Sequence, residues 1–153
     1  MSDEQLLSIG WREWVSLPEL GIAAIKAKVD TGARTSALHA FEVTPFSRNG
    51  IERVQFKIHP LQKDNDTVIV CTADIIDERT VRDSGGHKEQ RWVIKTPLKI
   101  GPHTWPIEIT LTARDDMLFR MLLGRTAIKG RAQVNPARSY IIGKKRKNQI
   151  RSI

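Results

Sequence analysis

Apolar and polar residues alternate with a period of two in several short segments, and this pattern constrains the fold more than any other feature. In residues 25–29 three apolar residues alternate with two lysines, and the pattern recurs in 53–58 and 105–112. Successive side chains of a strand point to opposite faces, so each segment is typical of a strand with one buried face. The β-rich run at 67–76 and the segment Ser139–Ile142 add two further expected strands.

Turn-forming residues separate these segments, at Ser47–Gly50, Lys63–Asp66, Gly85–Gly86 and Gly101–Pro102. Several short strands at this spacing predict an all-β fold, either a small barrel or a sandwich. One short helix is expected around Thr126–Lys129, after Gly124. The chain has 153 residues and shows no internal repeat or linker, so residues 1–143 are expected to form one domain.

The last ten residues, 144–153, hold five of the 25 lysines and arginines and no acid, within a net charge of +8. This basic C-terminal tail is interpreted either as a solvated end or as an electrostatic contact for RNA, the ribosome or an acidic protein. It contains no aromatic residue, so base stacking is not indicated.

Other features exclude whole classes of protein. A single cysteine, Cys71, rules out an internal disulfide and a four-cysteine zinc site. No apolar run approaches the ~20 residues of a membrane span. The sequence MSDEQLLSIG lacks the basic-then-apolar order of a secretion signal, so we expect a cytoplasmic protein without membrane contact.

The chemistry is predicted where the strand at 25–29 continues into Asp30-Thr31-Gly32-Ala33. A carboxylate at the end of a buried strand is costly unless it is hydrogen-bonded or paired. The glycine allows a sharp turn and a close backbone approach, and the threonine hydroxyl can hold the loop. Asp and Gly are also common at ordinary strand-to-turn junctions, so this segment alone leaves a purely structural role open.

A second motif, MLLGR at Met121–Arg125, favours catalysis. In pepsin-like and retroviral-type aspartic proteases, a D-T/S-G-A loop and a downstream apolar-apolar-Gly strand cross to form the active-site scaffold. This chain contains both, as VDTGA and LLGR. Its strings VDTGARTSALHA, VRDSGGHKEQRWVI and NPARSYII resemble a bacterial retropepsin-like (RimB-like) family, labelled as ATP-dependent zinc proteases and found near the RimK ribosomal-protein glutamate ligase. The resemblance covers nearly all of residues 10–143.

The resemblance implies a closed, retropepsin-like β-barrel that supplies half of an aspartic protease site. The reaction needs two carboxylates that share one proton, one acting as acid and the other as base on a water. One lobe offers only Asp30, so we expect a homodimer that brings two copies of Asp30 together at its two-fold axis. The residues expected to support this catalytic loop are Thr31, Gly32, Ala33, Gly124 and Arg125.

Asp83-Ser84-Gly85 also spells a permitted active-site tripeptide. No apolar strand leads into it, and Gly85-Gly86 indicates a hairpin tip, so Asp83 is not expected to be the second catalytic aspartate. Residues 80–94 are instead expected to form a β-hairpin flap that closes over substrate.

Basic side chains cluster on this flap and beside the aspartate loop. A solvated hairpin would account for them, but arginine is also suited to bind the carboxylates of an acidic peptide. The residues expected to bind substrate are Arg34, Arg79, Arg82 and Arg91. The family's setting beside a glutamate ligase implies an acidic or glutamate-tailed ribosomal protein as substrate.

The zinc and ATP of the family label find no support in the motifs. His39, His59, His87 and His103 are scattered, and neither HExxH nor a paired CxxC is present. His39 could reach the edge of the site, although a half-buried or surface position is the simpler interpretation. No phosphate-binding GxxxxGK[ST] occurs, so we expect neither metal nor another cofactor.

The chain is therefore predicted to be an aspartic endopeptidase-like hydrolase. The alternative is a non-catalytic β-barrel that binds ribosomal RNA or a ribosomal protein through its basic tail and flap. A strand-end aspartate favours the enzyme, whereas the net charge of +8 is explained better by the binding protein.

Overall fold

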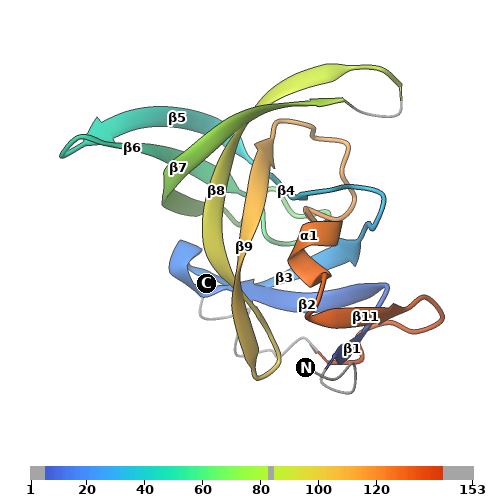
Figure 1. The fold of residues 1–153 in the computed structure, drawn as a ribbon. Helices are drawn as coiled ribbons and strands as arrows, with labels where there is room; N and C mark the ends of the chain where they lie inside the picture. The colour runs from blue at the N-terminus through green and yellow to red at the C-terminus, as the bar shows by residue number, and fades with distance from the viewer. Residues whose placement is uncertain (1–5, 83–84, 143–153) are drawn as a thin grey trace.

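The computed structural model describes residues 6–82 and 85–142, and these consist mainly of β-strands (Figure 1). The elements in chain order are β1 (Leu7–Gly10), β2 (Arg12–Leu17), the 3₁₀ turn η2 (Pro18–Leu20), β3 (Ile22–Val29), β4 (Ser36–His39), β5 (Phe41–Arg48), β6 (Ile51–Ile58), β7 (Ile69–Arg82), β8 (Lys88–Ile100), β9 (His103–Thr112), β10 (Met121–Leu123), α1 (Arg125–Ile128) and β11 (Ala132–Asn135).

Six of the strands form a closed barrel in the order β2-β3-β10-β4-β9-β8. The ring closes where β2 pairs with β8, at Ser16 and Lys99. This confirms the expected all-β, retropepsin-like fold. The short helix after LLGR is also confirmed, although α1 begins at Arg125, one residue before the expected start.

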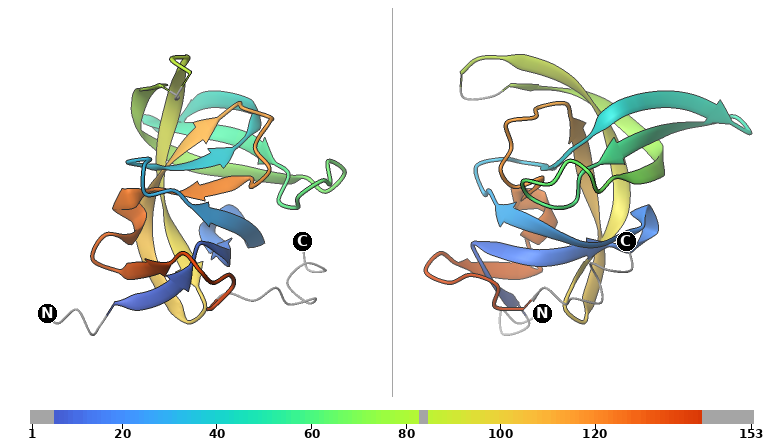
Figure 2. Two further views of the ribbon diagram at one scale, coloured as in Figure 1. Left: turned by 90° about the vertical axis from the view of Figure 1, so that its right-hand side faces the viewer. Right: turned by 180° about the vertical axis from the view of Figure 1, so that it is seen from behind.

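Strands β7, β6 and β5 continue the sheet beyond β8, and β5 and β6 project away from the barrel (Figure 1). Strand β7 runs to Arg82, well past the expected end at residue 76, and pairs with β8 as a long antiparallel hairpin. The far end of this hairpin arches over the loops between β3 and β4 and between β9 and β10, as the views in Figure 2 also show. The expected flap is therefore a hairpin above these loops.

One hydrophobic core, shared by the barrel strands and β6, includes the apolar residues of the alternating segments. On β6 the side chains of Val54, Phe56 and Ile58 are fully buried, and on β9 those of Ile107 and Ile109 are buried as well. Their polar neighbours on the same strands face the opposite side. In these two segments the period-two pattern therefore predicted the buried face correctly.

The prediction of a strand at Ser139–Ile142 is wrong. The backbone N–H groups of Ile141 and Ile142 donate instead to the carboxylate of Glu13, over 2.8 and 3.2 Å. Glu13 is fully buried and also accepts the N–H of Gly10 at 2.7 Å. Because a side chain takes these backbone donors, the segment cannot use them in a sheet ladder.

The last described strand is β11, which pairs in parallel with β1 as a separate two-stranded sheet. Neither β1, β2 nor β11 was predicted from the sequence. In β2 the inward positions are Glu13, Val15 and Leu17, so a carboxylate on the buried face hides the alternation.

Candidate active site

The catalytic loop and the LLGR motif lie together because their strands are parallel neighbours. Strand β10 pairs in parallel with β3, with Leu123 opposite Val29. Parallel strands in register end at the same edge of a sheet, so the residues that follow them, Asp30 and Gly124, leave the barrel side by side. The Asp30 N–H donates to the carbonyl of Leu123 at 2.8 Å.

Gly124 is required by a close backbone crossing. A Cβ atom on this residue would lie 2.4 Å from the carbonyl carbon of Thr35 and 2.7 Å from the nitrogen of Ser36. Its own N–H donates to Ser36 Oγ at 3.0 Å. In contrast, a Cβ on Gly32 would meet only Asp30 Oδ1, at 3.3 Å. The close approach that the sequence suggested near Gly32 is therefore made by Gly124.

Arg125 binds the backbone of the catalytic loop through two hydrogen bonds. Its backbone N–H donates to the carbonyl of Ala33 at 2.8 Å, and its Nη1 donates to the carbonyl of Thr31 at 2.9 Å. The N–H of Thr126 donates to the carbonyl of Arg34 at 3.0 Å. The residues expected to support the loop thus form one hydrogen-bonded unit with the start of α1.

Within this loop one oxygen of Asp30 is held and the other has no hydrogen-bond partner among the described residues. Asp30 Oδ1 accepts the N–H of Gly32 at 3.1 Å and that of Ala33 at 3.3 Å. These bonds orient the carboxylate at the loop surface, where Oδ2 can meet a reactant.

A cavity of about 640 Å³ opens beside this carboxylate, between the catalytic loop, the flap and the loop after β9. Asp30 is its one acidic lining residue among the described residues. The structure brings all four arginines expected to bind substrate to its wall: Arg34, Arg79, Arg82 and Arg91. A fifth arginine, Arg114, was not expected there.

These arginines differ in how their charge is compensated. Arg79 pairs with Asp77 at 2.8 Å and with Glu108 at 3.0 Å. Arg79 and Arg91 lie directly opposite each other on β7 and β8, where two unpaired cations would repel. Arg114 pairs with Asp116 at 3.3 Å.

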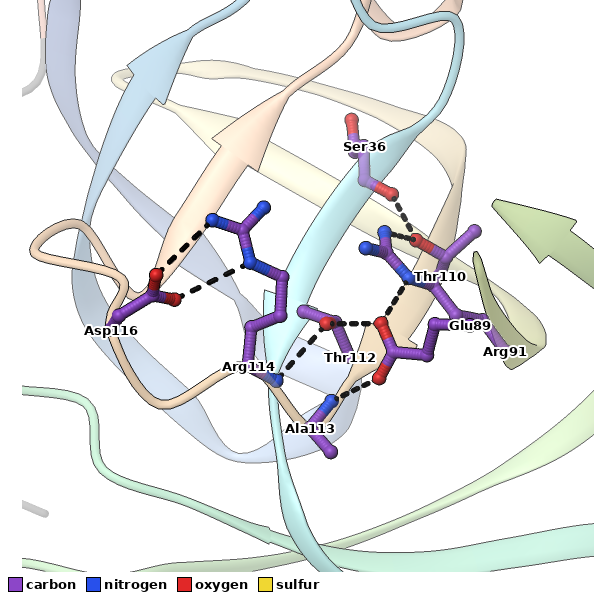
Figure 3. A network of polar contacts seen from close by, with 8 residues as sticks. All are labelled: Ser36, Glu89, Arg91, Thr110, Thr112, Ala113, Arg114 and Asp116. Atoms are coloured by element: carbon purple, nitrogen blue, oxygen red, sulfur yellow. Dashed lines mark hydrogen bonds and ion pairs between the residues drawn. The ribbon is translucent and has the colours of Figure 1, made fainter. Parts of the chain in front are cut away.

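Arg91 is paired as well, with Glu89 at 2.8 Å, and only 8% of it is exposed. Figure 3 shows its guanidinium inside a network of polar side chains from β8, β9 and β4. In contrast, Arg34 and Arg82 are exposed and have no ion-pair partner within the part of the chain that the structure describes. Among the described residues the cavity therefore offers two cations without an ion-pair partner beside one carboxylate.

Other candidate residues lie away from this cavity. His39 is 5% exposed, more buried than expected, and its Nδ1 has no hydrogen-bond partner among the described residues. Burial, and secondly the nearby Arg120 charge, lower the pKa of His39 below 6.5. Cys71 is confirmed as a core residue, and burial raises the pKa of its thiol to about 12, so it is not an activated nucleophile.

Asp83 and the basic tail at 144–153 lie outside the described residues. Across 6–82 and 85–142, no group of three or more His, Cys, Asp or Glu side chains is placed to hold a metal ion. In the same ranges no helix has the length and apolar character needed to cross a bilayer.

Comparison with known proteins agrees with this geometry. The RimB-like family, described as retropepsin-like aspartic endopeptidase RimB, matches residues 8–145. A crystal structure of a protein of unknown function from Legionella pneumophila superposes with a TM-score of 0.74 and 25% identity, covering 88% of this chain and 97% of that one.

Similar curated proteins carry a different name. A "Probable alpha-L-glutamate ligase" from Desulfotalea psychrophila is 49% identical over 142 residues, which are 93% of this chain and 31% of that protein. A protein of the same name from Parasynechococcus marenigrum is 47% identical over 145 residues, again 31% of its length. The chain thus spans about a third of these relatives.

Proposed function

The chain belongs to the RimB-like family of retropepsin-like aspartic endopeptidases, and we propose that it is an aspartic peptidase that cleaves acidic peptides. The observation that carries this proposal is the position of Asp30. Its carboxylate is oriented by two backbone N–H groups at the edge of a cavity that carries arginines and no second acid among the described residues.

The second carboxylate of the dyad comes from another copy of the chain. Two carboxylates a few ångströms apart share one proton, because both cannot be ionised at once. The catalytic loop is exposed at Thr31 and Gly32, so two such loops can meet across a two-fold axis. A homodimer therefore completes the site with Asp30 from each copy.

The reaction follows from this arrangement. The ionised Asp30 takes a proton from a water, whose oxygen attacks the peptide carbonyl carbon, while the protonated Asp30 donates to the carbonyl oxygen. When the tetrahedral intermediate breaks down, the C–N bond is cleaved and a proton passes to the leaving nitrogen. The products are a carboxylic acid and an amine, and no metal or other cofactor enters.

The two uncompensated arginines select the substrate. Arg34 lies next to the catalytic loop and Arg82 at the end of β7 in the flap, and both line the cavity. A guanidinium binds a carboxylate with two parallel hydrogen bonds, so these residues suit acidic side chains of a bound peptide. Arg79 lines the same cavity, but its charge is already compensated by Asp77 and Glu108, so it contributes less to substrate binding than Arg34 and Arg82.

The names of the relatives support a glutamate-rich substrate. In those proteins a region similar to more than nine-tenths of this chain forms part of a polypeptide named as a glutamate ligase. A peptidase for acidic peptides would act on the kind of product that glutamate ligation makes. We therefore propose a glutamate-tailed protein as substrate, a ribosomal protein in the cytoplasm in particular.

The test uses two synthetic peptides of equal length, one rich in glutamate and one with glutamine at the same positions. Mass spectrometry of the products should show cleavage of the glutamate peptide with at least tenfold preference, and high salt should reduce that preference because it screens the arginines. Replacement of Arg34 and Arg82 by glutamine should raise KM for the glutamate peptide and leave the thermal midpoint unchanged.

Sedimentation equilibrium at micromolar concentration tests the dimer. A monomer–dimer equilibrium, with specific activity that rises with protein concentration, is expected. A strictly monomeric species with full activity would refute the shared dyad. Absence of cleavage, with tight salt-sensitive binding to ribosomal RNA, would favour the non-catalytic alternative.

A further inference from the structure

Glu89 lies on β8 opposite Val81, near the tip of the flap, and its carboxylate accepts three hydrogen bonds. Its Oε1 accepts from Arg91 Nε and from Thr112 Oγ1, both at 2.8 Å, and its Oε2 accepts the N–H of Ala113 at 2.8 Å. Burial raises the pKa of Glu89, but the bonds from Ala113, Thr112 and Arg91 together lower it below 4.5. The carboxylate is thus ionised and fully occupied at neutral pH.

Arg91 carries the connection from Glu89 towards the catalytic loop (Figure 3). Its Nη1 donates to Thr110 Oγ1 at 3.2 Å, and the same hydroxyl donates to the carbonyl of Ser36 at 3.1 Å. Ser36 Oγ in turn accepts the N–H of Gly124 at 3.0 Å. Each of these contacts joins residues that are far apart in the sequence.

The path ends at the loop that carries Asp30. Gly124 is followed by Arg125, whose side chain and backbone bind the carbonyls of Thr31 and Ala33. An unbroken series of hydrogen bonds and peptide links therefore runs from the flap strand β8, through β9 and β4, to the catalytic loop.

Water cannot easily replace the links in this series. Ser36 is fully buried, Thr110 is 2% exposed and Arg91 is 8% exposed. A buried donor or acceptor that loses its partner costs more than the hydrogen bond itself contributes. Loss of one link would leave its buried neighbours unpaired, so we expect a displacement at the flap end to extend to Ser36.

We propose that Glu89 and Arg91 are positioning residues that couple the flap to the catalytic loop, and that Arg91 supports the cavity wall without binding the acidic side chains of the substrate. This proposal rests on the peptidase function proposed above. It distinguishes Arg91, which transmits the position of the flap, from Arg34 and Arg82, which bind substrate.

The first test replaces Glu89 by glutamine. In Glu89→Gln an NH₂ group replaces one carboxylate oxygen. This group faces either the N–H of Ala113 or the donors of Arg91 and Thr112, so at least one hydrogen bond is lost without a change in side-chain volume. The expected results are faster amide exchange at Gly124, by about tenfold, and a kcat lower by about tenfold or more, with KM changed less than about threefold. Glu78→Gln is the matched control, because Glu78 lies on the same hairpin but its carboxylate is exposed and contacts only Gln90 among the described residues.

The second test changes the middle of the network and leaves the ion pair intact. Thr110→Val replaces the hydroxyl with a methyl group of similar size, so we expect the same loss of kcat and the same faster exchange at Gly124. Thr110→Ser keeps the hydroxyl and should restore both. This pair of variants also decides the question if Glu89→Gln fails to fold.

Two results would overturn the proposal: unchanged exchange at Gly124 in both Glu89→Gln and Thr110→Val, or an effect of Arg91→Lys confined to KM. Amide exchange is measured without substrate. If the wild-type protein cleaves no peptide, the proposed function fails, while the coupling between flap and catalytic loop is still confirmed or refuted by exchange.

Discussion

Replacement of Asp30 by asparagine separates catalysis from structure. Asp30 Oδ1 accepts two backbone N–H groups, from Gly32 and Ala33. The side-chain oxygen of asparagine can accept both, so the loop should keep its shape. Asp30→Ala, in contrast, loses both bonds, at roughly 1 kcal/mol each. We expect Asp30→Asn to change the thermal midpoint by less than about 3 °C.

The same substitution removes the general base and the shared proton. Positioned acid–base catalysis contributes about 10²–10⁴ in rate, and Asp30→Asn removes it from both copies at once. The peptidase rate on the glutamate peptide should therefore fall by about 10⁴. The assay is initial rate by product mass spectrometry, alongside thermal unfolding.

Asp64→Asn is the matched control. Asp64 Oδ1 accepts the N–H groups two and three residues ahead, from Asp66 at 2.8 Å and Thr67 at 3.1 Å, in the same pattern as Asp30. Asp64 does not line the cavity, so its substitution should leave the rate unchanged. Full activity in Asp30→Asn, or an equal loss in Asp64→Asn, would refute the aspartic mechanism.

Three further predictions concern stability and metal. Gly124→Ala should lower the unfolding free energy by roughly 1–3 kcal/mol or more, because the new Cβ would lie 2.4 Å from the backbone of Thr35. An unchanged denaturation midpoint would contradict the close backbone approach at Gly124. The lowered pKa of His39 means that its contribution to stability is present above about pH 6.5 and is lost as pH falls below that value. The urea midpoint of the wild-type protein should therefore decline more steeply than that of His39→Gln between pH 6.5 and 5. Parallel declines in the two proteins would contradict the role of His39 in this pH dependence. Dialysis against a chelator should leave the thermal midpoint and the peptidase rate unchanged, whereas stoichiometric zinc whose removal abolishes activity would show that the site is not purely carboxylate-based.

Local patterns in the sequence determined several of the strands and the two halves of the catalytic scaffold. Alternation in 53–58 and 105–112 predicted buried faces, because side-chain direction in a strand depends only on neighbouring residues. The D-T-G-A loop and LLGR were recognisable for the same reason, since each is a short, continuous segment. Their pairing follows from the family resemblance, and the parallel register of β3 and β10 provides its physical basis.

Only the tertiary structure decided which charged groups are compensated. Four arginines looked equivalent in the sequence, but Arg91 is buried with Glu89 while Arg34 and Arg82 remain exposed. Likewise, the segment expected to form the last strand donates its backbone N–H groups to the carboxylate of Glu13 and does not join a sheet. These outcomes depend on contacts between residues distant in the chain, and a charge is stabilised or left free by its neighbours in space, which no local pattern records.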